Sequence, residues 1–116
     1  MITKPFEIYL ANINPKKGHE VVKTRPVVVI HSQLIEGLLS TSIVCPITTQ
    51  IAAATLLRVH IPFQDASKTG LTEPSDIIVD QIRSIDNQRL INKLGELPPA
   101  QIEQLQKSLQ TILTVH

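Results

Sequence analysis

The chain has 116 residues, of which 42% are hydrophobic and only 3% aromatic, and its formal net charge is +1. This length favours a single domain over residues 1–116 with an aliphatic core. Its one cysteine, Cys45, excludes an internal disulfide and is expected to be a buried thiol. No apolar run approaches the roughly 20 residues that a membrane helix needs. We therefore expect a soluble, cytoplasmic protein with no membrane partner.

The first half of the chain predicts strands separated by polar loops. Residues 7–13 are rich in strand formers and end at a turn signal. Residues 15–24 are polar, which indicates a long connecting loop. The run 26–30 is apolar on both faces and predicts a central strand, and residues 42–47 predict another buried strand.

The second half predicts three more strands and a closing helix. Apolar and polar residues alternate through 57–61, with Arg58 and His60 on the polar side. Residues 63–74 are expected to be a loop, and strands are expected at 76–82 and 91–97. After Pro98-Pro99, one helical stripe is apolar: Ile102, Leu105, Leu109, Ile112 and Leu113. The whole pattern predicts an α+β fold dominated by β, a small and mostly antiparallel sheet or barrel.

Positive charge is concentrated in the long loop before the second predicted strand. Residues 14–26 contain Lys16, Lys17, Lys23 and Arg25 against a single acid, Glu20. Such a patch suits a polyanion, although a solvated lysine loop is the commoner explanation of a short basic cluster.

The usual sequence signals of metal and cofactor chemistry are absent. Asp76 and Asp80 are expected on one face of a strand, but no third carboxylate is spaced to join them. The four histidines are scattered, and there is no phosphate loop, dinucleotide turn or serine nucleophile elbow. We therefore predict no metal and no cofactor, so an enzyme of this sequence would use Arg, Thr, Glu or His directly.

Three stretches of sequence, taken together, indicate a particular protein family. They are Asn14–Glu20 followed by Lys23–Pro26, then Pro46–Gln50, and finally Asp80–Asp86. Their order and spacing resemble the MazF (PemK-like) toxin family, the ribonuclease halves of bacterial toxin–antitoxin pairs. Each motif alone is common, whereas all three in register over nearly the whole chain are specific.

The resemblance implies a compact SH3-like antiparallel barrel with a C-terminal helix, assembled as a homodimer. It also implies sequence-specific cleavage of single-stranded RNA and inhibition by a MazE-like antitoxin with an acidic segment. The family's catalytic arginine and threonine match Arg25 and Thr48, and its loop glutamate matches Glu20. Two RNA-contacting positions near the later strand match Ser75 and Gln81.

The residue types suit cleavage of RNA without a metal. RNA carries its own nucleophile, the 2′-hydroxyl, so the enzyme supplies a base, a cation for the phosphate and an acid for the leaving 5′-oxygen. The guanidinium of Arg25 matches two phosphate oxygens. Thr48 can donate from its hydroxyl, although without the resemblance a turn-capping threonine is the much commoner explanation of such a residue. Glu20 is the favoured base, and its neighbour His19 is the alternative.

The remaining candidates are expected to bind RNA. Lysines bind phosphates without reading sequence, and the shortage of aromatic residues means that hydrogen bonds must supply most of the base recognition. The expected RNA-binding residues are Asn14, Lys16, Lys17, His19, Lys23, Thr49, Gln50, Ser75 and Gln81.

The chain departs from the family at its first strand, where the usual Gly-Asp is replaced by Phe6-Glu7. Glu7 keeps the negative charge, so we expect the pairing of that acid to persist. Phe6 is expected not to adopt the backbone angles open to glycine, so the first turn should differ.

Two alternative functions remain open. The first is a CcdB-type toxin, which inhibits a topoisomerase. That family shares the barrel, but its C-terminal tail carries a functional tryptophan. This chain has no tryptophan and ends Leu113-Thr114-Val115-His116. A degenerate RNA-binding barrel without activity is the second alternative, and intact Arg25 and Thr48 argue against it.

Overall fold

The computed structural model describes residues 2–13, 23–35, 37–53 and 55–114, which form an antiparallel β structure with a C-terminal helix. The strands are β1 (Glu7–Asn12), β2 (Thr24–Val29), β3 (Thr41–Thr48), β4 (Arg58–Ile61), β5 (Ser75–Ile78), β6 (Arg83–Asp86) and β7 (Leu90–Glu96). The helices are α1 (Ala66–Thr69) and α2 (Pro99–Ile112), with 3₁₀ turns η1 (Gln33–Ile35), η2 (Phe63–Asp65) and η3 (Asn87–Arg89). The predicted α+β fold dominated by β is confirmed. Neither α1 nor α2 is long and apolar enough to cross a membrane.

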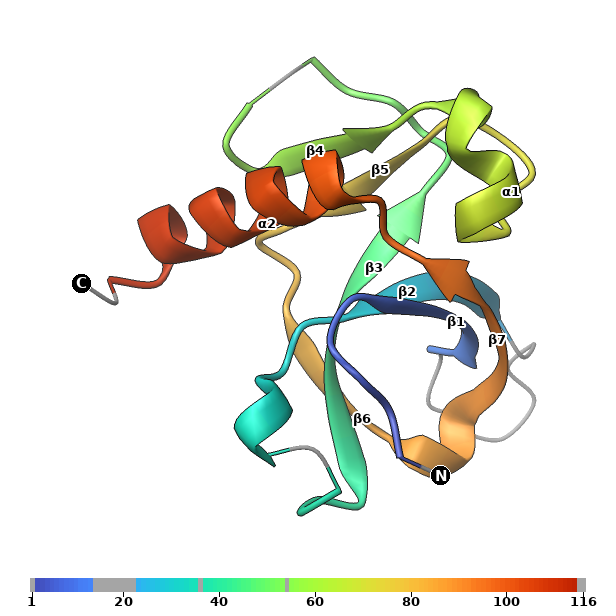
Figure 1. Ribbon diagram of the computed structural model, residues 1–116, viewed down its shortest axis with the longest axis vertical. Helices are drawn as coiled ribbons and strands as arrows, with labels where there is room; N and C mark the ends of the chain where they lie inside the picture. Colours follow the sequence, from blue (N-terminus) through green and yellow to red (C-terminus); the bar gives the residue numbers. More distant parts are fainter. Residues whose placement is uncertain (1, 14–22, 36, 54, 115–116) are drawn as a thin grey trace.

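The strands form one curved sheet that divides at β3. Its order is β4-β5-β3-β2-β1-β7, and β6 pairs with β3 off this path. The first half of β3, Thr41 to Val44, pairs with β6, whereas its last two residues, Ile47 and Thr48, pair with β5. β1, β2, β6 and β7 therefore lie toward one end of the molecule and β4 and β5 toward the other, with α2 running across β4 and β5 (Figure 1).

Alternating side chains supply the two faces of this sheet with separate apolar clusters. The main core contains Ile8, Val28, Cys45, Ile47, Val59, Ile61, Leu71, Ile77, Val79, Leu97 and Leu105. The second cluster contains Tyr9, Ala11, Val27, Val29, Val44, Ile85 and Leu90. Leu105 of α2 is 0% exposed, and Ile102, Leu109 and Ile112 pack against the main core, as the predicted stripe implies. Leu113 was also expected in the stripe, but it lies beyond the end of α2 and is 43% exposed. Cys45 is a buried free thiol, and burial followed by the charge of Asp80 raises its pKa to about 12.

One predicted strand is wrong. The apolar run 76–82 was expected to be continuous, but β5 ends at Ile78 and β6 begins at Arg83. The chain turns between them, where the Gln81 N–H donates to the carbonyl of Ile78 at 3.3 Å. Asp76 and Asp80 therefore do not share a face, because Asp76 is buried in β5 whereas Asp80 is exposed in the turn.

Two other differences from the prediction are larger than a one-residue shift of a strand end. β2 begins at Thr24, two residues earlier than expected, so Arg25 lies inside a strand rather than before it. The expected loop 63–74 contains η2 and the four-residue helix α1, which ends at Gly70 with a left-handed φ of 74°. A Cβ on Gly70 would lie 2.1 Å from the carbonyl oxygen of Leu94, so this turn requires glycine.

The expectation for Phe6 is also wrong, because Phe6 adopts a left-handed φ of +67°. Two backbone hydrogen bonds hold it there: its N–H donates to Val29 at 2.8 Å, and its carbonyl accepts from Leu97 at 2.9 Å. The Phe6 side chain packs against the main core. These contacts offset the steric cost of a left-handed residue that carries a side chain.

The negative charge at position 7 keeps its pairing, as expected. The carboxylate of Glu7 accepts from the Lys4 N–H at 2.6 Å and from the Tyr9 hydroxyl at 3.1 Å, and it pairs with Lys93 Nζ at 2.9 Å. Burial alone would raise the pKa of Glu7, but the hydrogen bonds and the charge of Lys93 outweigh burial and lower it.

Candidate functional site

Arg25 and Thr48 lie at the same end of neighbouring strands. Arg25 is the second residue of β2 and pairs with Ala11 of β1, and Thr48 is the last residue of β3. The paired residues of β2 and β3 end at Val27 and Pro46, and extending this register by two residues would set Arg25 opposite Thr48. Facing residues on adjacent strands project to the same side of a sheet, with their Cβ atoms about 4.5–5.5 Å apart. The two residues that the resemblance singled out therefore lie at the same end of neighbouring strands.

Both side chains have donors available for a ligand. Arg25 is half-buried, and among the described residues no side-chain hydrogen bond or ion pair engages its guanidinium. Thr48 is also half-buried, and its Oγ1 accepts a hydrogen bond from the Gln50 N–H at 3.1 Å. The hydroxyl hydrogen of Thr48 thus remains free to donate. A permanent cation beside a hydroxyl donor can hold the oxygens of a phosphodiester.

Three other candidates lie at the same end of the sheet. Lys23 directly precedes β2 and is exposed, and its carbonyl accepts from the Ile13 N–H at 3.1 Å. Thr49 and Gln50 directly follow β3 and are exposed. The structure therefore groups Lys23, Thr49 and Gln50 around the Arg25–Thr48 pair.

The two later candidates are placed differently from each other. Gln81 is exposed in the turn between β5 and β6. Ser75 pairs with Ile61 and is 2% exposed, and its hydroxyl donates to the carbonyl of Glu73 at 2.9 Å. Ser75 is thus engaged inside the protein, and its RNA contact stays a prediction. Five further candidates lie outside the described residues: Asn14, Lys16, Lys17, His19 and Glu20.

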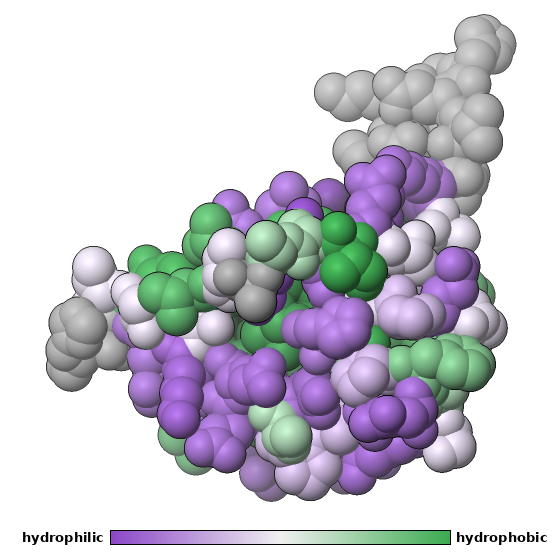
Figure 2. All heavy atoms as spheres, turned by 90° about the horizontal axis from the view of Figure 1, so that it is seen from above, coloured by the Kyte–Doolittle hydropathy of each residue, from purple (hydrophilic) through white to green (hydrophobic). Residues whose placement is uncertain are grey.

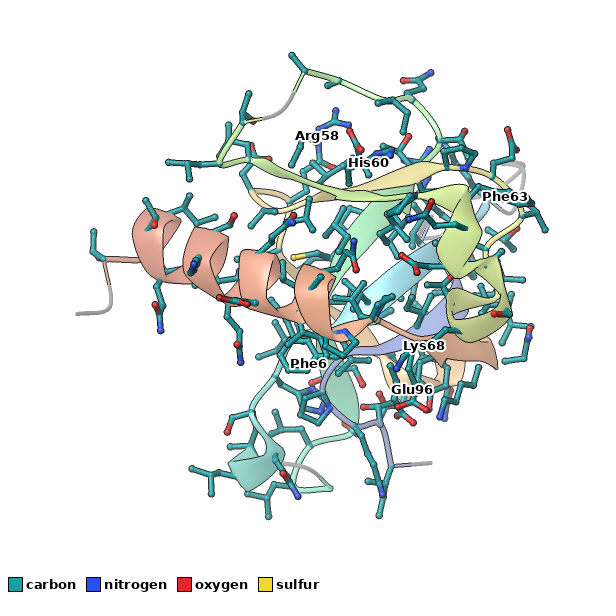
Figure 3. All side chains as sticks on the ribbon, turned by 45° about the horizontal axis from the view of Figure 1, so that its top comes forward. Phe6, Arg58, His60, Phe63, Lys68 and Glu96 are labelled. Atoms are coloured by element: carbon teal, nitrogen blue, oxygen red, sulfur yellow. The ribbon has the colours of Figure 1, made fainter. Side chains whose placement is uncertain are left out.

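A buried carboxylate next to Thr48 was missed by sequence reasoning. Asp76 of β5 pairs with Thr48 on one side and with His60 of β4 on the other, and it is 1% exposed. Its Oδ1 lies 3.0 Å from His60 Nδ1, and its Oδ2 accepts from Arg58 Nη1 at 3.3 Å and from the Ala52 N–H at 3.0 Å. Figure 3 shows Arg58 and His60 next to each other on β4.

The only signal for this cluster in the sequence was the polar face of Arg58 and His60. The alternation placed their side chains correctly but gave no partner, because the pairing of β4 with β5 depends on the fold. Within the described ranges, no group of three or more His, Cys, Asp and Glu side chains is arranged to hold a metal ion.

The surface around the β3–β4 connection is chemically mixed. Figure 2 views the end of the molecule that carries β4, where polar side chains surround smaller groups of apolar ones. Ile51, Leu56 and Leu57 of this connection are 49%, 59% and 43% exposed. Hydrogen-bonding and apolar groups are thus both exposed on the segment that follows Thr48.

The fold and the site together define a small, curved antiparallel β protein with an Arg–Thr pair at one rim of its sheet. The chain belongs to the PemK-like, MazF-like toxins of type II toxin–antitoxin systems, whose family model matches residues 4–113.

Two relatives agree with this assignment, and solved structures share the fold. The chain is 36% identical over 115 residues to Endoribonuclease EndoA of Bacillus subtilis, covering 99% of this chain and 97% of that protein. It is 32% identical over 110 residues to Endoribonuclease MazF of Staphylococcus saprophyticus, covering 95% and 90%. A MazE–MazF structure from Deinococcus radiodurans shares the fold with a TM-score of 0.79 at 20% identity, covering 100% of both chains. Toxin MazF-mt6 of Mycobacterium tuberculosis has a TM-score of 0.75 at 22% identity, covering 95% of this chain and 98% of that chain.

Proposed function

We propose that this chain is a toxin that cleaves single-stranded RNA at specific sequences without a metal ion. The observation that carries the proposal is the Arg25–Thr48 pair at the rim of the sheet, in a member of this toxin family. The endoribonucleases EndoA and MazF, which are 36% and 32% identical to the chain, support an endoribonuclease activity.

The chemistry follows from the two side chains and the substrate. The 2′-hydroxyl of one nucleotide attacks its own 3′-phosphate, the bond to the 5′-oxygen of the next nucleotide breaks, and the products are a 2′,3′-cyclic phosphate and a 5′-hydroxyl. Arg25 neutralises the charge that develops on the five-coordinate phosphate. Thr48 donates its free hydroxyl hydrogen to a phosphate oxygen. Glu20 takes the proton of the 2′-hydroxyl, with His19 as the alternative base. The leaving 5′-oxygen takes a proton from water, and the proton held by the base then returns to the solvent, so the step balances.

Substrate binding would use the side chains around this pair. Lys23, with Lys16 and Lys17, would bind phosphates, which orients RNA without reading its sequence. Thr49, Gln50 and Gln81 are exposed and able to hydrogen-bond to bases. Asn14, His19 and Ser75 complete the proposed RNA contacts.

We further infer that the chain forms a homodimer and binds an acidic antitoxin. Four aliphatic side chains, Ile2, Leu34, Leu38 and Leu39, are 61%, 89%, 72% and 48% exposed, which is an apolar surface suited to a second protein chain. MazE–MazF structures share this fold and support an antitoxin partner. Light scattering tests the dimer, since a mass near 12.9 kDa at micromolar concentration would contradict it.

One cleavage experiment tests the activity. The purified protein is incubated in EDTA with a pool of single-stranded RNAs, and the ends of the products are identified. We expect cleavage to persist and to leave a 5′-hydroxyl and a cyclic or opened 3′-phosphate. A substrate with a 2′-deoxy nucleotide before the cut should stay intact, and its cleavage would rule out attack by the 2′-hydroxyl. An RNA that is bound but never cut would instead indicate the degenerate RNA-binding barrel.

A further inference from the structure

The hydroxyl of Thr48 stands at one end of a continuous chain of hydrogen bonds. Thr48 Oγ1 accepts from the Gln50 N–H at 3.1 Å, and the carbonyl of Gln50 accepts from Arg58 Nη1 at 3.0 Å. The same Nη1 donates to Asp76 Oδ2 at 3.3 Å. Asp76 is in turn the residue that pairs with Thr48 between β3 and β5. This path of hydrogen bonds therefore runs from Thr48 through the β3–β4 loop to Asp76, which pairs with Thr48 across the sheet.

The buried carboxylate of Asp76 anchors these hydrogen bonds. It is 1% exposed, and its Oδ2 also accepts from the Ala52 N–H at 3.0 Å, two residues beyond Gln50. The segment that follows Thr48 is thus tied to Asp76 directly at Ala52 and through Arg58 at Gln50. Thr49, Gln50 and Ala52 are themselves exposed, so little packing holds this segment in place. Hydrogen bonds that involve a charged group are the strong ones, which suits them to this task.

We propose that Arg58 and Asp76 are positioning residues that set the orientation of the Thr48 hydroxyl through Gln50. This inference rests on the proposed ribonuclease activity. It adds to the catalytic residues two residues that act on Thr48 and not directly on the RNA. With Gln50 held, its N–H occupies an acceptor position of Thr48 Oγ1 and directs the hydroxyl hydrogen elsewhere. Without that restraint, the hydroxyl rotates among several positions, and fewer bound substrates meet a correctly aimed donor.

His60 offers a matched control because it shares the carboxylate of Asp76 but not the loop. Its Nδ1 binds Oδ1, whereas the loop contacts use Oδ2. The side chain of His60 is 50% exposed, and that of Arg58 is 25% exposed. If the cluster served only to satisfy a buried charge, the loss of either partner would have similar consequences.

The experiment measures the steady-state kcat and KM of RNA cleavage by Arg58→Gln and His60→Gln in the wild-type background and in the Thr48→Ala background. In the wild-type background, we expect Arg58→Gln to lower kcat at least tenfold with KM within twofold, and His60→Gln to lower it less than twofold. In the Thr48→Ala background, Arg58→Gln should change the residual rate less than twofold, because there is no hydroxyl left to position. An equal loss in both backgrounds, or equal losses for the two variants, would overturn the proposal.

Asp76→Asn provides an independent second test. The amide keeps one acceptor for Ala52 but loses the charge that holds Arg58, so it should reproduce the kcat loss and show no further loss when combined with Arg58→Gln. Thermal unfolding confirms that each variant is folded at the assay temperature. If the wild type fails to cleave, or if Thr48→Ala cleaves at the wild-type rate, the proposed function itself is wrong. If Thr48→Ala is impaired while Arg58→Gln and Asp76→Asn are not, only the positioning role is wrong.

Discussion

Thr48 of β3 and Asp76 of β5 face each other in the sheet, so a half-buried hydroxyl and a buried carboxylate are direct neighbours. Without a positively charged partner, the carboxylate of Asp76 would repel a phosphate bound by Thr48. Arg58 compensates for this charge at 3.3 Å, and His60 can add to the compensation when protonated. Arg25 lies on β2, on the opposite side of β3 from Asp76, and the extended β2–β3 register would set it opposite Thr48. The negative charge of Asp76 is therefore compensated on its β4 side by Arg58, although it lies next to Thr48.

The first prediction separates catalysis from folding. Arg25→Ala and Thr48→Ala should each reduce kcat about 10²–10³-fold, the usual effect of removing one donor to a transition state. Both variants should keep the wild-type circular dichroism spectrum, because both side chains are half-buried at the end of a strand. Arg25→Lys should restore little activity, because an ammonium cannot replace the two-pronged guanidinium. Unfolding of Arg25→Ala would indicate a structural anchor instead.

The second prediction identifies the base from the pH dependence of kcat. A glutamate with an ordinary pKa of about 4.3 is fully ionised above pH 6, so a Glu20 base gives a nearly flat rate from pH 6 to 8. A histidine base gives a rate that climbs through a pKa of about 6.5. We expect the flat profile, with Glu20→Gln losing more than tenfold and His19→Gln losing less. A low-pH limb that disappears in His19→Gln would assign the role to His19.

The third prediction concerns acid stability at Glu7. The folded state lowers the pKa of Glu7 below its ordinary value of 4.5, so the ionised carboxylate stabilises the fold above that pH. This contribution is lost as pH falls through the lowered pKa. Glu7→Gln should therefore reduce the free energy of unfolding by about 1–2 kcal/mol at pH 7, with the deficit shrinking below pH 4.5. Urea titrations at several pH values measure both effects.

A surface ion pair supplies the control for that experiment. Glu103 pairs with Lys107 at 3.4 Å within α2, and both side chains are more than 70% exposed, at 71% and 74%. Such pairs contribute little, so Glu103→Gln should change the free energy of unfolding by less than about 0.5 kcal/mol. A deficit for Glu7→Gln no larger than that of Glu103→Gln would show that burial cancels the gain from its hydrogen bonds.

The fourth prediction tests the strained backbone at Phe6. Phe6→Ala and Phe6→Gly both remove the ring that packs on the main core, but only alanine retains the Cβ at a φ of +67°. Phe6→Gly should therefore be more stable than Phe6→Ala by about 1 kcal/mol, the reverse of the order expected at an ordinary strand position. Thermal unfolding of the two variants measures the difference. A more stable Phe6→Ala would mean that the turn relaxes once the ring is removed.

Local pattern was enough to locate most of the elements. The alternation through residues 57–61 predicted β4, and the apolar stripe after Pro98-Pro99 predicted α2. Both patterns are visible because an element buried on one face has apolar residues at regular intervals. The same reasoning failed at residues 76–82. Val79 is buried and Ile82 half-buried although both lie in the turn, so the apolar pattern continues where the strand does not.

The sequence by itself determined the family and the candidate pair Arg25 and Thr48, since both lie in short motifs whose order and spacing are visible in one dimension. The tertiary structure alone decided what surrounds them. Asp76 meets Ala52 and Arg58 across 24 and 18 residues, and only the register of β5 against β3 and β4 brings these groups together. That register depends on how both faces of the sheet are buried at once, and a shift of one residue would turn Asp76 toward the main core.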